Sequence, residues 1–354
     1  MVFHYYGWSG LQANPFSHEF IYRTGIYAVL MFYVISGISF GYVYNKMSMD
    51  RASLGSFWIK RFFRLAPLYW LGIVMTLLPS FYSSKPFPSI SDIVLNVSVT
   101  FGAIDPGAYI VTGGWSIGNE MAYYIIFPLL LLAIRRSFTT FALVLAGSVI
   151  LGGFYAYDWL SPTQTLAEQW NTYIHPGSHL FYFVAGVGLS WPLLRSITVP
   201  VRVGIGLSLA LLLAFALLPH GPSPVDNISI VTGWRWAAYS AVCIALVGTL
   251  ALTPTNLANW LHVPLSWLGR VSYAVYLMHP IVYRLSEPVL AALGISIPTY
   301  VVAAPLTLIF SEMTFRFLEK PLIDRGRSLA RRYSEWATKR AQTPKTENVP
   351  PQQW

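Results

Sequence analysis

Nine long apolar runs, separated by short polar segments, constrain the fold of this 354-residue chain more than any other feature. A helix needs roughly 20 mostly apolar residues to cross a hydrocarbon core of about 30 Å. Hydrophobic residues make up 55% of the chain and charged residues only 10%, whereas about a quarter of residues are charged in soluble proteins. We therefore predict an all-α, polytopic integral membrane helical bundle. The nine predicted spans are residues 26–44, 65–82, 121–134, 138–157, 179–194, 201–219, 233–252, 267–284 and 298–318, preceded by a partial first span at residues 1–8.

The distribution of lysine and arginine predicts how this bundle is oriented. Short cytoplasmic loops retain these cations, and most of the 23 lie on one predicted side. The other side has Arg23, Lys85, Arg235 and Arg284, and Arg316 lies within the last span. This alternation places the carboxyl terminus in the cytoplasm, as in a protein of the bacterial inner (plasma) membrane. The net charge of +9 reflects this orientation, so it does not indicate nucleic acid as a partner.

The chain divides at residue 318 into a membrane domain, residues 1–318, and a basic cytoplasmic tail, residues 319–354. The polar composition of the tail, with Pro344, Pro350 and Pro351, predicts that its end is disordered. Cys243 is the single cysteine and lies within a span, which excludes an intramolecular disulfide.

Small residues within the predicted spans indicate helix packing. Gly37, Gly186 and Gly188 allow neighbouring helices to approach closely, and no glycine-rich phosphate-binding motif is present in the sequence. Of the seven histidines, only His175 and His179 are four residues apart, with a proline and a glycine between them. This pair lacks the HExxH pattern of a zinc-binding helix, so we predict no bound metal.

Three cations, Lys60, Arg61 and Arg64, lie where the chain enters the second predicted span from the cytoplasm. Lys60 and Arg64 share a helix face, and the planar fork of an arginine fits phosphate oxygens. The start of a helix adds unpaired N–H groups and the positive end of the helix dipole. The cluster is therefore a candidate site for a nucleotide-bearing donor. A second interpretation, ordinary positive charges that flank a cytoplasmic helix end, stays open.

Glu120 opens the span at residues 121–134 near the outer interface and begins an aromatic helix face. Tyr123 and Tyr124 follow three and four residues later, so they share this face with the carboxylate. Upstream, Trp115 suits the aromatic belt of the interface, and Ser116 is suited to cap the helix. A carboxylate at this depth can act as a general base or orient a histidine. A solvated helix-start acid favoured by the dipole is the alternative.

His4 and His279 both fall in the outer half of the predicted membrane. His279 lies twelve residues beyond Trp267, where its span enters from the cytoplasm, and this is about 18 Å along a helix axis. A histidine can take a proton from a hydroxyl near neutral pH, which makes it a candidate general base. An intramembrane histidine can instead have a purely structural role, as a hydrogen-bonded packing residue. For His279, which precedes Pro280, this alternative stays open.

Seven short motifs occur in a fixed order along the chain. They are His4 with a short outer loop, MFYVISGISF from Met31, RFFRLAPLYW from Arg61, WSIGNEMAYYIIFP from Trp115, FYFVAGVGL from Phe181, LGRVSYAVYLMHP from Leu268 and FLEKP from Phe317. In this order they resemble the bacterial membrane acyltransferase 3 family, which includes exopolysaccharide and O-antigen O-acetyltransferases. The resemblance covers essentially the whole chain.

This resemblance implies ten spans with both ends in the cytoplasm, an acyl-CoA donor bound from the cytoplasm, and an acceptor sugar met at the periplasmic side. Family members also carry an arginine upstream of the first-span histidine, and the chain begins too late to contain it. We therefore expect Met1 to be an internal residue of a longer first span. Carried over by residue, the family's histidine falls on His4, its arginine pair on Arg61 and Arg64, and its tryptophan-serine-glutamate motif on Trp115, Ser116 and Glu120.

We predict a membrane O-acetyltransferase that moves an acetyl group from cytoplasmic acetyl-CoA to a hydroxyl of a cell-envelope or exported glycan, such as an exopolysaccharide or lipopolysaccharide. His4 would take the acceptor proton, and Glu120 would orient the imidazole or stabilise its cation. Acetyl-CoA would be a substrate, with no permanently bound cofactor. Lys60, Arg61 and Arg64 would hold the CoA phosphates, and the expected substrate-binding residues are Trp115, Ser116, Tyr123, Tyr124 and His279.

A glycan or lipid transporter is the alternative function, since aromatic spans with sparse internal charges would suit it equally well. A transporter would not need the cation cluster at Lys60, Arg61 and Arg64. The acceptor glycan, the acyl chain length, the oligomeric state and the choice between direct transfer and an acyl-enzyme intermediate stay open.

Overall fold

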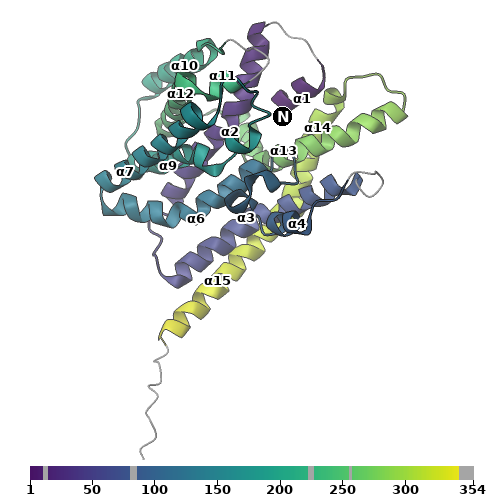
Figure 1. Cartoon of the computed structure of the whole chain (residues 1–354). Coiled ribbons are helices and arrows are strands. Elements are labelled where there is room, and N and C mark those ends of the chain that lie inside the picture. Colours follow the sequence, from purple (N-terminus) through teal and green to yellow (C-terminus); the bar gives the residue numbers. More distant parts are fainter. Residues whose placement is uncertain (11–14, 80–85, 222–226, 255–256, 343–354) are drawn as a thin grey trace, which may run out of the picture.

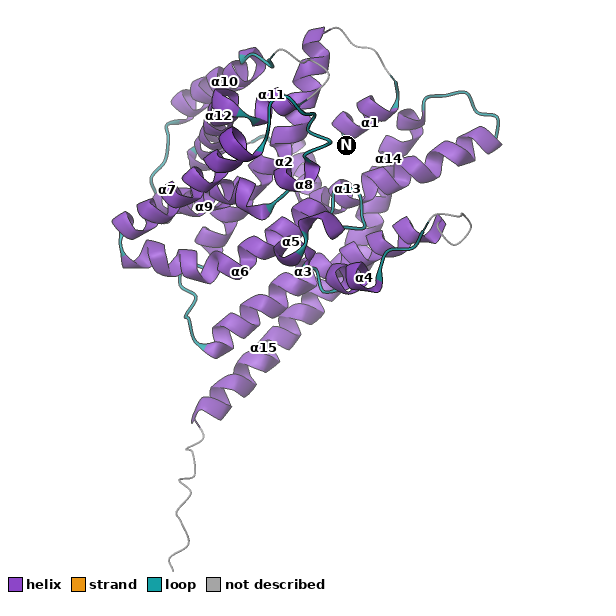
Figure 2. Cartoon of the chain, viewed as in Figure 1, coloured by secondary structure: helices purple, strands orange, loops and turns teal. Residues whose placement is uncertain are grey.

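The computed structural model describes residues 1–10, 15–79, 86–221, 227–254 and 257–342, and this part of the chain is helical with no strand (Figure 2). The all-helical prediction is thereby confirmed. The count of nine spans stays a prediction, and the end of the predicted span 65–82 lies outside the described residues. Within them, five helical segments are long and apolar enough to cross a membrane: Glu19–Val43, Trp115–Arg136, Phe138–Trp159, Gly233–Leu252 and Thr299–Ala341.

The helices are arranged as in Figure 1, with three short 3-10 or π segments designated η. Asp50 begins α3, because its carboxylate accepts a hydrogen bond from the Ser53 amide at 2.8 Å. In chain order the elements are α1 (Val2–Trp8), α2 (Pro15–Val43), α3 (Arg51–Leu77), α4 (Ile90–Val97), α5 (Phe101–Ile104), η2 (Pro106–Ala108), α6 (Trp115–Arg136), α7 (Phe138–Phe154), η3 (Tyr155–Trp159), α8 (Trp170–Tyr173), α9 (Pro176–Leu194), α10 (Val201–Leu217), α11 (Ile228–Val231), α12 (Gly233–Leu252), α13 (Asn259–Ala292), α14 (Thr299–Thr314), η4 (Phe315–Glu319) and α15 (Lys320–Gln342).

Helices α2 and α9 pack with almost no space between their backbones. A methyl group added to Gly37 would collide with the carbonyl oxygen of Phe183, and one added to Gly186 would collide with that of Val34. A methyl group at Gly188 would press against a phenylalanine ring of α7. The predicted role of these glycines in close helix packing is therefore confirmed.

The last helix runs along α3 and extends beyond the bundle (Figure 1). Helices α14, η4 and α15 follow one another without a break. Gly55 near the start of α3 lies against Tyr333, and Phe63 lies against Gly326, so α3 and α15 are antiparallel. Single π turns inside helices are frequent at functional sites. The π turn η4 ends on Glu319, which is only 2% exposed.

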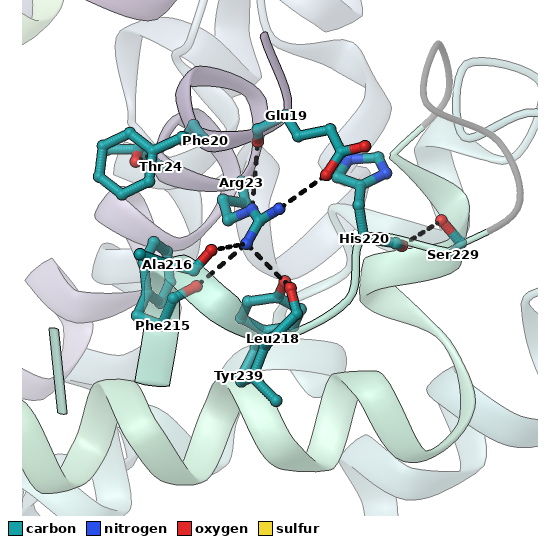
Figure 3. A network of polar contacts seen from close by, with 10 residues as sticks. All are labelled: Glu19, Phe20, Arg23, Thr24, Phe215, Ala216, Leu218, His220, Ser229 and Tyr239. Carbon is teal, nitrogen blue, oxygen red and sulfur yellow. Dashed lines mark hydrogen bonds and ion pairs between the residues drawn. The ribbon is translucent and has the colours of Figure 1, made fainter. Parts of the chain in front are cut away.

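Arg23 ties the start of α2 to the end of α10 (Figure 3). Its Nη1 donates to the carbonyl oxygens of Phe215, Ala216 and Leu218 at 3.2, 2.8 and 2.9 Å. Its Nη2 pairs with Glu19 at 3.0 Å, and the arginine is buried. The last carbonyls of a helix have no partner within the helix, and a cation there also meets the negative end of the dipole. The sequence identified Arg23 only as an outer-side cation.

We expect Arg23→Met to lower the free energy of unfolding by about 3 kcal/mol, because it leaves buried carbonyl groups and a carboxylate without their donor. The matched control is Arg316→Met. It breaks another i,i+4 pair, with Glu312, in which the arginine is 67% exposed, and such pairs contribute little. Unfolding of the detergent-solubilised chain measures both variants. Equal loss of stability in the two would contradict the assigned role of Arg23.

Candidate active site

A cavity of about 360 Å³ lies between α2, α3, α6 and α13, and we call it the Glu120 cavity. It brings together residues that are far apart in the sequence and that belong to four helices. Arginine, carboxylate and hydroxyl groups share this space with apolar side chains, so the cavity contains polar groups deep within an apolar bundle. Its polar lining residues are Tyr33, Ser36, Ser39, Arg61, Arg64, Ser116, Glu120, Tyr124, Ser272, Tyr273 and Tyr276.

The Glu120 carboxylate is held by two hydroxyl groups. Its Oε1 accepts hydrogen bonds from Ser36 Oγ at 3.0 Å and from the hydroxyl of Tyr124. Tyr124 stands four residues further along α6, so it lies directly over Glu120 on the same helix face. Ser36 comes from α2. These two bonds fix the direction of the carboxylate, and the described residues place no hydrogen bond on Oε2.

The two predicted phosphate-binding arginines line this cavity and are themselves fixed in place. Arg61 donates to the Tyr44 hydroxyl at 2.9 Å, and its guanidinium lies 4.9 Å from the centre of the Phe40 ring. Arg64 pairs with Glu319 at 2.7 Å. The Arg61 Nε is buried without a hydrogen-bond partner among the described residues. Both arginines therefore keep donor capacity for an anionic ligand.

A second cavity, of about 800 Å³, adjoins the first and shares Arg61, Arg64 and Gly269 with it. We call it the basic vestibule. Its lining contains seven cations but one carboxylate, that of Asp324. An anion-binding site needs such an excess of positive charge. The seven cations are Lys60, Arg61, Arg64, Arg270, Lys320, Arg327 and Arg331.

The crowding of these charges is visible at Lys60. Burial, together with the neighbouring charges of Arg61, Arg327 and Arg331, lowers the pKa of the Lys60 ammonium group. A bound polyanion would relieve this repulsion. The sequence placed Lys60, Arg61 and Arg64 in one cluster, and the structure adds four more cations from α13 and α15. The sequence indicated only that these four cations lie on the same predicted side of the membrane as Lys60, Arg61 and Arg64.

His4 and His279 lie together near the amino end of the chain. Their ring centres are 5.2 Å apart, and the Trp8 ring stacks on His4 at 5.1 Å. The Nδ1 of His279 is 3.0 Å from the Val275 carbonyl oxygen. A carbonyl can only accept, so Nδ1 carries the hydrogen and Nε2 has a free lone pair. This Nε2 is buried without a partner in the part of the chain that the structure describes.

The expected pairing of Glu120 with His4 is not present. Glu120 bonds to Ser36 and Tyr124, and the described residues include no contact between its carboxylate and His4. Tyr276 connects the two regions, because it lines the Glu120 cavity and its ring centre is 6.3 Å from that of His279. The structure thus places Glu120 and His4 in different clusters, with Tyr276 between them.

Trp115 and Ser116 do not occupy the positions predicted for them. Trp115 is buried, 7% exposed, with its ring centre 5.9 Å from that of Trp170 in α8, so its assignment to the lipid interface was wrong. Gly114, without a side-chain bond, is the N-cap of α6, so the predicted Ser116 cap was also wrong. Ser116 instead lies 2.8 Å from the Tyr276 hydroxyl. The short helix α8 packs on Trp115, whereas Ser116 lines the Glu120 cavity beside α13.

Tyr123 points away from the Glu120 cavity. Its hydroxyl donates to the Pro176 carbonyl oxygen at 2.9 Å, on the side of α9.

His175 caps α9, since its Nδ1 accepts from the Gly177 amide at 3.1 Å. Among the described residues, no three metal-ligating side chains gather at one point.

Comparison with known proteins identifies relatives of this chain by sequence similarity. The chain is 26% identical over 336 residues to the peptidoglycan O-acetyltransferase OatA of Listeria monocytogenes. This alignment covers 86% of this chain and 52% of the Listeria protein. It is 27% identical over 345 residues to the exopolysaccharide production protein ExoZ of Rhizobium meliloti, covering 93% and 96%. The chain therefore spans about half the length of the Listeria protein. No solved structure matches it.

A family model described as an acyltransferase domain matches residues 1–314. This range includes the Glu120 cavity and the histidine pair, as well as all helices from α1 to α14. Because the match extends over most of the chain and agrees with the motif order, the chain belongs to the acyltransferase 3 family.

Proposed function

We propose that this chain is a membrane O-acetyltransferase that moves an acetyl group from cytoplasmic acetyl-CoA to a hydroxyl of a cell-envelope or exported glycan. The observation that carries the proposal is the junction of the basic vestibule with the Glu120 cavity at Arg61 and Arg64. Family membership supports the reaction class. The names of the Listeria and Rhizobium relatives support a glycan acceptor.

The basic vestibule suits the nucleotide end of acetyl-CoA, which carries several phosphate charges. Arginine binds phosphate through two parallel N–H groups, and Arg327 and Arg331 of α15 face Arg61 and Arg64 of α3 across this space. The acyl end of the donor would extend past Arg61 and Arg64 into the Glu120 cavity. With the carboxyl terminus in the cytoplasm, as the sequence predicts, the vestibule would open toward the cytoplasmic donor.

The acceptor hydroxyl would approach from the side of His4 and His279. Its oxygen attacks the carbonyl carbon of the thioester, its proton passes to the imidazole of His4, and the C–S bond breaks. The CoA thiolate leaves and takes a proton from the imidazolium. His279 lies beside His4, and Glu120, on the donor side, would stabilise the positive charge that develops.

The experiment that tests the function uses the purified chain with acetyl-CoA labelled in the acetyl group. Label should appear on the hydroxyls of the added glycan while CoA is released. A transporter would move glycan or lipid without consuming acetyl-CoA, so absence of acetyl-CoA turnover would favour that alternative.

We expect Arg331→Gln to weaken acetyl-CoA binding about tenfold, because it removes one charged hydrogen bond to phosphate. The matched control is Arg332→Gln. Arg332 is the next residue of α15 and is exposed, but it does not line the basic vestibule. Titration of acetyl-CoA against the solubilised variants measures both affinities. Equal affinities in the two variants would show that general positive charge, and not this vestibule, attracts the donor.

We expect Glu120→Gln to lower turnover by about a hundredfold or more while acetyl-CoA binding stays close to that of the unmodified chain. The amide oxygen can still accept from Ser36 and Tyr124, so the cavity keeps its shape and loses only the charge. Single-turnover transfer and donor titration on the same preparation separate the two effects. Near-normal transfer would exclude a role for the carboxylate charge in the reaction.

A further inference from the structure

A third cavity, of about 650 Å³, lies between the end of α3, α4, η2 and the second half of α13, and we call it the outer groove. It shares no lining residue with the Glu120 cavity or the basic vestibule. Its polar side chains include Asp92, Tyr109, Arg284 and Glu287. The sequence identified none of these four as candidate site residues.

The outer groove reaches the neighbourhood of the histidine pair. The Arg284 guanidinium lies 5.9 Å from the centre of the Trp8 ring, and Trp8 stacks on His4 at 5.1 Å. Arg284, which lines the groove, follows His279 by five residues on α13, about 7.5 Å along the helix axis. A ligand that contacts Arg284 in the groove therefore lies beside the Trp8 ring that stacks on His4.

The lining has the chemistry of a saccharide site. Trp170 Nε1 donates to the Tyr109 hydroxyl at 2.8 Å. Since an indole N–H can only donate, Tyr109 accepts there and keeps its own hydrogen for a ligand. Asp92 Oδ2 accepts from the Ser89 amide at 3.3 Å in the capping box of α4, which leaves Oδ1 to accept from a sugar hydroxyl. The Glu287 carboxylate can also accept, and Arg284 can donate to ring or hydroxyl oxygens.

The charge balance of the groove narrows the class of ligand. Two carboxylates face one guanidinium, so a polyanionic glycan would meet more repulsion than attraction there. An acyl chain would have to desolvate the three charged side chains, which disfavours it although most of the other lining residues are apolar. An uncharged, hydroxyl-rich chain fits both conditions.

We propose that the outer groove is the acceptor subsite and that it binds an uncharged saccharide segment through Asp92, Tyr109, Arg284 and Glu287. The hydroxyl to be acetylated then lies at His4 and His279. This inference rests on the proposed O-acetyltransferase function, and it assigns acceptor recognition to a surface separate from that which binds acetyl-CoA.

The first test combines Asp92→Asn with Glu287→Gln, which keeps side-chain size and removes both charges. O-acetylation of the native glycan is measured in cells that carry the full chain, and acetyl-CoA affinity is measured on the same solubilised variant. We expect acetylation to fall about tenfold or more, with donor affinity unchanged. The control is Glu168→Gln, an exposed carboxylate on the loop before α8 that lines none of the three cavities.

Acetylation equal to that of the Glu168→Gln control would overturn the inference. A parallel loss of donor affinity would also overturn it, because it would indicate a general structural role. Failure of the unmodified chain to acetylate any glycan would instead contradict the proposed function itself.

A second test does not depend on how the double variant folds. Thr76 lines the groove at the α3 end, and the natural Cys243 is buried. Thr76→Cys is treated from outside the cell with a bulky, membrane-impermeant maleimide, with Glu168→Cys as the matched control. We expect the reagent to lower glycan acetylation about tenfold or more in Thr76→Cys, relative to the same untreated protein, and to leave the control unchanged. A labelled Thr76→Cys chain with full activity would contradict the assignment of the groove.

Discussion

The ion pair between Arg64 and Glu319 is the interaction on which the arrangement of the site depends. The Glu319 side chain is 1% exposed and its Oε2 lies 2.7 Å from Arg64 Nη1. A buried carboxylate is stable only when it is paired, and removal of one partner of such a pair typically costs about 3–5 kcal/mol. The pair joins α3 to the π turn that leads into α15, so it fixes the helix that supplies Lys320, Arg327 and Arg331 to the basic vestibule.

The same pair also separates two environments. On one side, the cations of α3, α13 and α15 face a wide polar space. On the other, Arg64 lies 5.2 Å from the centre of the Tyr273 ring, at the narrower Glu120 cavity. Beyond that cavity, the Tyr276 hydroxyl donates to the Gly113 carbonyl oxygen at 2.9 Å. Gly113 has a φ of +81°, which favours glycine, and an added methyl group would press on the Tyr276 hydroxyl.

Tyr276 therefore lies between the Glu120 cavity and the histidine pair. A reaction that joins a charged cytoplasmic donor to a hydroxyl acceptor from the other side needs a boundary between the two sides, because an open channel would leak ions and water. In the proposed mechanism the thioester of the donor and the acceptor hydroxyl meet beside Tyr276.

The sequence predicted those parts of the fold and site that depend on local spacing. The apolar runs identified the long helices, and the four-residue separation of Glu120 and Tyr124 identified their shared face, which the hydrogen bond between them confirms. The sequence could not identify Ser36 as the second partner of Glu120, nor Arg270 and Arg331 as neighbours of Arg61. Helical periodicity determines which residues share a face of one helix, whereas neighbouring helices are selected by packing of the whole bundle.

The same reason explains the incorrect expectations. Trp115 was assigned to the lipid interface because aromatic residues near a helix start are typical of that position. In the structure, Trp170 and Tyr173 of α8 and His179 of α9 pack around the ring and bury it. Glu120 was expected to orient the His4 imidazole or to stabilise its cation, because both residues belong to family motifs. The described residues show no contact that would orient the ring. The order of motifs along a chain contains no information on their distance in space.

The most direct test of the central claim is an experimental structure of the chain with a non-hydrolysable acetyl-CoA analogue bound. The account predicts that the phosphates lie between α3 and α15 in contact with Arg61, Arg64 and Arg331, and that the acyl end lies in the Glu120 cavity. Phosphates bound outside the basic vestibule, or an acyl end that does not enter the Glu120 cavity, would contradict it.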